Sequence, residues 1–202
     1  MLEPHLFALH SLTLKQMATP DQLAEITGRG ESELAGDLEK AEADGTALSR
    51  KGRYLISPAG REALDAAYPT AFADIRSSAA VAEAIESFET GVNKQILDLT
   101  TQWQTHDLGG EQVPNDHSDT DYDDEIIDKL GRAIERTAKV LRPIADADPL
   151  VDRFVERLGA ALTRAEGGET DYVSGLRVDS VHTVWFQMHE HLLRMTGRER
   201  PE

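Results

Sequence analysis

The 202-residue sequence contains no cysteine, which excludes disulfide bonds and thiolate metal ligands. Its apolar runs all fall short of the roughly 20 residues that a membrane-spanning helix needs. The N-terminus also lacks a basic and apolar signal pattern, so we expect a cytoplasmic protein that is not embedded in a membrane. Only 5% of the residues are aromatic, and alanine is frequent, which suits a mainly α fold. The net charge of −16 repels polyphosphates at long range.

The first 65 residues contain start and stop signals for three helices and a hairpin. Thr19 is followed by Pro20 and Gln22, which is the pattern of a capped helix start. Ser57 and Pro58 form a second start signal, directly after the expected hairpin. The expected helices span His5–Lys15, Thr19–Gly28 and Glu31–Asp44, and the expected strands span Ala47–Ser49 and Tyr54–Ser57. We therefore predict a first domain at residues 1–65.

Residues 66–202 are expected to form a second, helical domain. A nearly continuous helix is predicted from Arg61 to Trp103, with a break near Pro69. Its apolar seam consists of Ile85, Phe88, Val92, Ile96, Leu99 and Trp103. Because this spacing is typical of a helix packed along another helix, we expect the seam to be buried either within one subunit or across the two-fold axis of a homodimer formed through Ala71–Trp103. The segment Thr105–Glu125 contains eight acidic residues and no Lys or Arg, which predicts a polar loop before three further helices.

The motif Tyr54-x-x-Ser57-x-x-Gly60-Arg61 resembles that of winged-helix regulators of the MarR and PadR kind, over Leu6 to about Leu64. The second half is similar to a poorly characterised bacterial family, through Trp103 and the stretches 114–119, 122–123 and 182–190. This chain has Glu190-His191 where that family's pattern ends in an acidic pair. The resemblance implies an N-terminal winged helix-turn-helix with a small β-wing, followed by an all-helical bundle, in a DNA-binding transcriptional regulator.

Charge is distributed unevenly over the candidate DNA-binding residues. In a winged helix the third helix normally enters the major groove, but residues 30–45 carry six acidic residues against Lys40, a net charge of −5. The wing carries Arg50, Lys51 and Arg53, a net charge of +3. The residues that we expect to contact DNA are Arg29, Lys40, Arg50, Lys51 and Arg53. The alternative is an adaptor that binds no DNA and uses its winged helix to dock a partner protein.

Histidines, tryptophans and acidic residues of the second half form another candidate site. Three interpretations remain open for it: a structural lock between loop and last helix, a pocket that senses a small-molecule effector, or the metal site of an enzyme. His182 and His189 are about 10.5 Å apart along a helix axis, too far for one ion. We expect no metal, no cofactor and no enzymatic activity. The candidate residues are Trp103, Asn115, Asp116, His117, Asp119, His182, Trp185 and His189.

Overall fold

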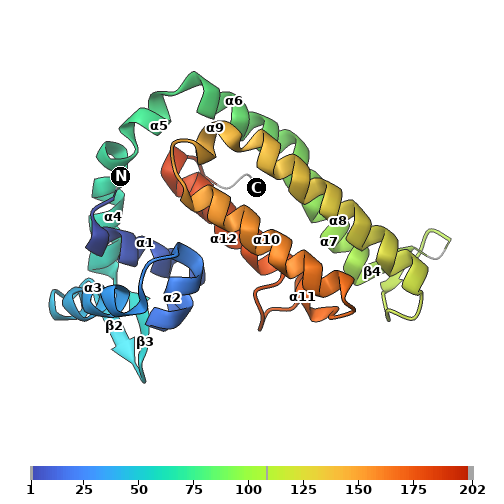
Figure 1. Cartoon of the computed structure of the whole chain (residues 1–202), viewed down its shortest axis with the longest axis horizontal. Coiled ribbons are helices and arrows are strands. Elements are labelled where there is room, and N and C mark those ends of the chain that lie inside the picture. The colour runs from blue at the N-terminus through green and yellow to red at the C-terminus, as the bar shows by residue number, and fades with distance from the viewer. Residues whose placement is uncertain (1, 108, 200–202) are drawn as a thin grey trace. The chain divides into compact units, whose positions relative to one another are not determined.

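The computed structural model describes residues 2–107 and 109–199, so the predicted domain ends at residues 1 and 202 lie outside the described residues. The fold is mainly helical with little sheet, as expected from the composition (Figure 1). Two compact units are present. The first comprises Met1–Ser78 and Gln187–Glu202, and the second comprises Ala79–Phe186. The boundary that the sequence suggested, after residue 65, instead falls inside a helix of the first unit.

The first unit contains three helices followed by a hairpin, and the hairpin strands extend from the helices (Figure 1). Its strands form an antiparallel sheet in the order β1-β3-β2. Leu9, Leu23 and Leu38, one from each of the three helices, are buried in its core. The elements are α1 Pro4–Lys15, β1 Met17–Ala18, α2 Pro20–Thr27, α3 Glu31–Ala43, β2 Ala47–Arg50, β3 Arg53–Ile56, α4 Pro58–Ala71 and α5 Ala73–Ser77, with the second half of α12 Val181–Thr196.

The predicted helix starts of the first unit are confirmed. The backbone N–H of Thr19 donates to the Gln22 side chain at 3.2 Å, and Gly28 ends α2 with a φ of 73°. At the start of α4, the Ser57 hydroxyl oxygen accepts from the Gly60 N–H at 3.1 Å and donates to a carbonyl at 2.7 Å. These local bonds fix where α2 and α4 begin, because they satisfy amides that have no partner inside the helix.

The segment from Arg61 to Trp103 is interrupted at two places, whereas a single break near Pro69 was expected. The chain leaves helical geometry at Phe72, with a φ of −113°, and at Ser78, which is extended with a ψ of 119°. Pro69 lies inside α4 and does not end it. Near the second break, the Ser77 hydroxyl donates to the Asp74 carbonyl. Such side-chain bonds to the backbone compete with helix formation, and the neighbouring alanines bury too little surface to counter them.

The second unit is a helical bundle in which α7 and α10 each pack against α8 (Figure 1). The expected polar loop is partly a two-stranded antiparallel sheet of β4 and β5, so this half is not all-helical. Asp119 caps α8, which begins at Thr120, five residues before the expected start at Glu125. The elements are α6 Ala79–Ser87, the π-helix η1 Phe88–Asn93, α7 Lys94–Gln104, β4 Thr105–Asp107, β5 Gln112–Pro114, α8 Thr120–Val140, α9 Arg142–Ala145, α10 Leu150–Glu166, α11 Asp171–Ser174 and the start of α12.

The apolar seam from Ile85 to Trp103 is buried within one copy of the chain. Each of its six residues is at most 4% exposed, because η1 and α7 lie against the apolar face of α8. The seam is therefore already covered within one copy of the chain, and the homodimer stays a prediction. Helix-on-helix spacing is the same whether the partner helix is in the same chain or another. Among the described residues, no helix is both long and apolar enough to cross a membrane.

Candidate functional sites

The tip of the β2–β3 hairpin carries three exposed cations, Arg50, Lys51 and Arg53, which we call the tip cations. Lys51 and Gly52 form the turn with φ values of 53° and 74°, as a tight two-residue hairpin requires. Within the described residues, the side chains of the tip cations make no ion pair or hydrogen bond with the rest of the chain. The tip therefore presents +3 to solvent on a protein of net charge −16.

The other two predicted DNA contacts differ in availability. Lys40 is exposed on α3. The Arg29 guanidinium, by contrast, donates to the Pro4 carbonyl at 3.2 Å and pairs with the Asp37 carboxylate at 2.8 Å. A second carboxylate, that of Glu33, is 3.8 Å away. Arg29 thus serves to hold the start of α3 against the chain, and a phosphate would have to displace these bonds.

The strand register assigns each sheet residue to one of two faces, since residues paired across strands point the same way. The inner face consists of Ala18, Ala47, Ser49, Tyr54 and Ile56. The outer face consists of Met17, Leu48, Arg50, Arg53 and Leu55. The inner face lies toward α3, because the Ser49 hydroxyl donates to the Glu42 carboxylate at 2.5 Å. Burial, with the charges of Glu42 and Glu39, raises the pKa of Tyr54 on the same face.

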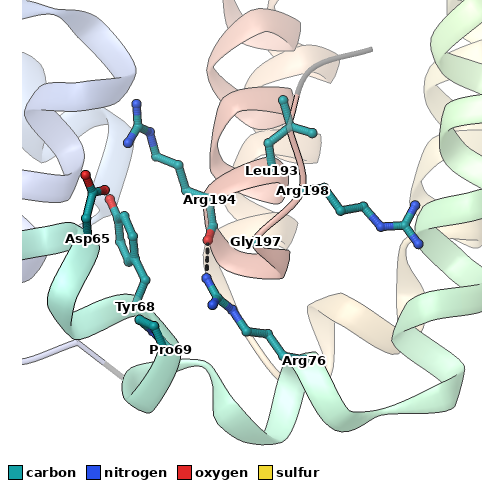
Figure 2. Close-up of a pocket in the computed structure, with 8 residues that line it drawn as sticks. All are labelled: Asp65, Tyr68, Pro69, Arg76, Leu193, Arg194, Gly197 and Arg198. Atoms are coloured by element: carbon teal, nitrogen blue, oxygen red, sulfur yellow. Dashed lines mark hydrogen bonds between the residues drawn. The ribbon is translucent and has the colours of Figure 1, made fainter.

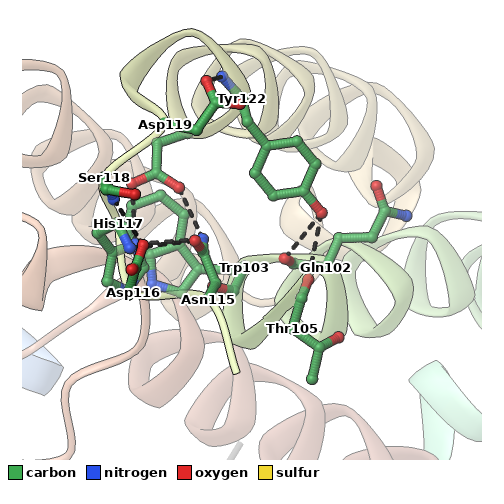
Figure 3. A network of polar contacts seen from close by, with 10 residues as sticks. Gln102, Trp103, Thr105, Asn115, Asp116, His117, Ser118, Asp119 and Tyr122 are labelled. Atoms are coloured by element: carbon green, nitrogen blue, oxygen red, sulfur yellow. Dashed lines mark hydrogen bonds and ion pairs between the residues drawn. The ribbon is translucent and has the colours of Figure 1, made fainter. Parts of the chain in front are cut away.

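Four residues of the second unit form a polar lock between α7 and the start of α8, and Figure 3 shows its surroundings. The Asn115 side-chain amide donates to the Asp123 carboxylate at 2.8 Å and to the Trp103 carbonyl at 3.1 Å. The His117 Nδ1 lies 2.8 Å from the other Asp123 oxygen, and its ring centroid is 4.6 Å from that of Trp103. Asp123 is only 7% exposed, so these bonds compensate for burying its carboxylate.

Asp116 and Asp119 lie beside the lock and stabilise local backbone. The Asp116 carboxylate accepts from the Ser118 N–H at 3.0 Å, and hydrogen bonds from Ser118 lower the pKa of Asp116. The Asp119 carboxylate accepts from the Tyr122 N–H at 3.1 Å as the N-cap of α8. Both carboxylates are thus bonded to backbone amides close to them in sequence.

Trp185 and His182 of the last helix make contacts with other residues of the second unit. The Trp185 indole N–H donates to the Asn93 side-chain oxygen at 3.0 Å, and its ring stacks on Phe88 at 5.2 Å. His182 is half-buried beside Phe186, and burial lowers the pKa of His182. His189 is buried in the first unit. Of the eight predicted residues, Trp103, Asn115 and His117 are in contact with one another.

Sequence reasoning missed two further groups. Asp123 completes the lock, and its position four residues after the cap Asp119, on the apolar side of α8, was the available signal. A second group in the first unit links three buried side chains. The His10 Nδ1 lies 2.9 Å from the Tyr68 hydroxyl, and the His10 Nε2 lies 2.9 Å from the His191 Nδ1. No local pattern connects residues that are 58 and 181 positions apart.

An open pocket of about 250 Å³ adjoins Tyr68 in the first unit (Figure 2). Three arginines line it, but they do not converge on one point. Arg76 donates from Nε to the Met195 carbonyl at 2.9 Å and from Nη2 to the Arg194 carbonyl at 3.0 Å, so it caps the end of α12. Arg194 pairs with Glu190, and Arg198 extends away from the other two arginines (Figure 2). The arginines are thus arranged as helix-end contacts more than as an anion site.

The described residues contain no group of three or more His, Cys, Asp or Glu side chains placed to hold a metal ion. Comparison of the chain with family models, curated proteins and solved structures finds no match. Function is therefore inferred from the exposed and internally bonded residues described above. The tip cations and Lys40 differ from the other candidates because they are charged, exposed and without a partner in the described chain, and the tip cations alone are clustered at one turn.

Proposed function

We propose that the chain is a winged-helix transcriptional regulator that holds duplex DNA through the tip cations of its β2–β3 hairpin. The support is the element order of the first unit: three helices, a two-stranded hairpin and a capped helix, with α2 and α3 preceding the hairpin. This is the order found in regulators of the MarR and PadR kind, which the motif around Ser57 resembles.

A single observation supports the DNA contact most directly. Arg50, Lys51 and Arg53 are exposed and unpaired in the described chain, although acidic residues outnumber basic ones 37 to 21. Phosphate contacts by Lys and Arg supply most of the sequence-independent affinity for DNA. Three unpaired cations at one turn provide such contacts without breaking any bond of the folded chain.

A second candidate function rests on α3. Glu31, Glu33 and Glu39 are exposed there, and α3 is strongly acidic overall. Such a helix favours a basic partner protein over DNA. The chain would then be an adaptor that binds no DNA. We do not extend the regulator proposal to effector sensing at Trp103 and Trp185, because each is 2% exposed and bonded within the chain.

The test is a binding titration at several salt concentrations, with labelled duplex from the region upstream of the chain's own coding sequence. The unmutated protein should bind at low salt, with a logarithmic affinity that falls linearly with logarithmic salt. The triple variant Arg50→Gln, Lys51→Gln, Arg53→Gln should reduce the salt slope by about 3 per bound protomer.

The control is a variant that loses three positive charges from the second unit instead, where Lys94, Arg136 and Lys139 are exposed. Replacing these three with Gln should leave the slope unchanged. Unaltered affinity in the hairpin variant would refute the role of the tip. Absence of binding by the unmutated protein at low salt would refute the regulator and favour the adaptor.

A further inference from the structure

The outer face of the sheet is apolar and basic, unlike most of this acidic chain. Leu55 is paired with Met17 on one side and with Leu48 on the other, so the three form a row across the strands. Met17 is 40% exposed and Leu48 is 50% exposed. Two residues further along the hairpin, Arg50 pairs with Arg53 on this same face. Exposed apolar patches rimmed by polar or charged residues commonly mark interaction surfaces.

The arginine pair gives a second indication of an anionic partner. Arg50 and Arg53 are directly opposite one another in the register, next to the turn. Like charges in directly opposed positions destabilise a hairpin. An anion bound between the two guanidinium groups would relieve that repulsion, and phosphate or a guanine edge would accept hydrogen bonds from both.

The acidic helix lies on the other side of the sheet. Glu42 of α3 is hydrogen-bonded to Ser49. Besides burial, the charges of Glu42 and Glu39 raise the pKa of Tyr54. Ser49 and Tyr54 both belong to the inner face. Charges separated by more than about 8–10 Å are largely screened at physiological salt. A duplex on the outer face would therefore be shielded from the carboxylates of α3. A duplex with α3 in its groove would place those carboxylates among the phosphates.

We propose that the hairpin, with its outer face toward the bases, enters the major groove in place of α3. This inference rests on the proposed function, because it assumes that the chain binds duplex DNA. The major groove admits a two-stranded ribbon, whereas the minor groove, about 6 Å wide, would first have to be opened. Arg50 and Arg53 then contact guanine edges or phosphates, and Leu48 and Leu55 contact thymine methyl groups.

The experiment compares two duplexes of the same mixed sequence, one made with thymine and one with uracil in every thymine position. The two differ only by the C5 methyl groups in the major groove. The unmutated protein should bind the thymine duplex more tightly, by about fourfold for each methyl group buried. Leu48→Gln should reduce the preference for the thymine duplex, with Leu55 retaining its own share, and should keep the salt slope of the unmutated protein, because an apolar contact releases no counterions.

Leu97→Gln is the matched control, because Leu97 is 47% exposed on α7 of the second unit. It should retain the preference for thymine. The double variant Glu33→Gln, Glu39→Gln tests the position of α3. If the carboxylates of α3 are screened from the duplex, the affinity of this variant for the thymine duplex should differ from that of the unmutated protein by less than about twofold.

Three outcomes overturn the inference. Equal binding of the thymine and uracil duplexes by the unmutated protein would show that the outer face does not contact the major groove, while the proposed DNA binding stands. A gain of about tenfold or more in the Glu33→Gln, Glu39→Gln variant would place α3 against the phosphates. No binding of either duplex at low salt would refute the proposed function as well, and would leave the outer face to a protein partner.

Discussion

The buried hydroxyl of Tyr68 should make the protein sensitive to alkaline pH. Tyr68 is 4% exposed and is hydrogen-bonded to His10, which is in turn bonded to His191. Burial raises the pKa of Tyr68 from 10.0 to about 12, although nearby Arg194 acts in the opposite direction. The folded chain therefore holds this proton at pH values where the unfolded chain releases it.

The sign and size of the effect follow from linkage between protonation and folding. Because the folded pKa lies above the unfolded one, the stabilisation by the neutral phenol is complete below pH 10. It is lost as the pH rises through 12. Between pH 8 and pH 11 the loss amounts to about 1.4 kcal/mol of the free energy of unfolding. Tyr68→Phe removes the titrating group, so the variant should lack this part of the pH dependence.

The assay is urea denaturation of the unmutated protein and of Tyr68→Phe at several pH values from 8 to 11. At pH 8 the variant should be less stable by about 1–3 kcal/mol, because the His10 ring nitrogen loses its partner. This difference should shrink as the pH rises. Tyr172→Phe, which changes a tyrosine near Arg164, should follow the unmutated protein. An equal loss of stability in the unmutated protein and Tyr68→Phe between pH 8 and 11 would refute the reasoning.

Three further changes test the interiors of the two units. Gly60→Ala should cost about 1–3 kcal/mol in urea denaturation, because a Cβ there would lie 2.1 Å from the Thr46 carbonyl oxygen. Asn93→Leu should cost about 1–3 kcal/mol by the same measurement, since the buried Trp185 indole N–H loses its acceptor. Burial lowers the pKa of His182, so the unmutated protein should lose stability as the pH falls below 6.5. The variant His182→Leu should lose less stability over the same pH range. An identical acid dependence of the two proteins would contradict this prediction.

The parts of the fold that were predictable have signals within a few residues of one another. Thr19 with Gln22 and Ser57 with Pro58 mark helix starts, because cap and amide are neighbours along the chain. The Lys51-Gly52 turn likewise follows from local backbone preference. The partner of the apolar seam was not predictable, since a pattern of buried positions does not identify the helix that covers them. The same holds for Asn93 and Trp185, whose contact joins residues 92 positions apart.

The candidate site was likewise predictable only where its residues are close to one another in sequence. The tip cations are consecutive around one turn, so their common position required no tertiary information. The lock was only partly predicted, because the Asp123 carboxylate points inward from a helix whose start was expected later in the chain. Trp185 and the histidines of α12 share a helix with each other, but helical periodicity gives no information on which loop they meet.

The first unit is discontinuous in sequence, which has a consequence for its biosynthesis. Its first stretch ends at Ser78, and its second stretch begins at Gln187, after the whole second unit. Chains fold from the N-terminus as they leave the ribosome. Until the last helix has been synthesised, the Arg76 guanidinium lacks the Met195 and Arg194 carbonyls that it holds in the finished fold. The second unit can thus be completed first on the nascent chain, and the hairpin-bearing unit becomes complete only after the second half of α12 has been synthesised.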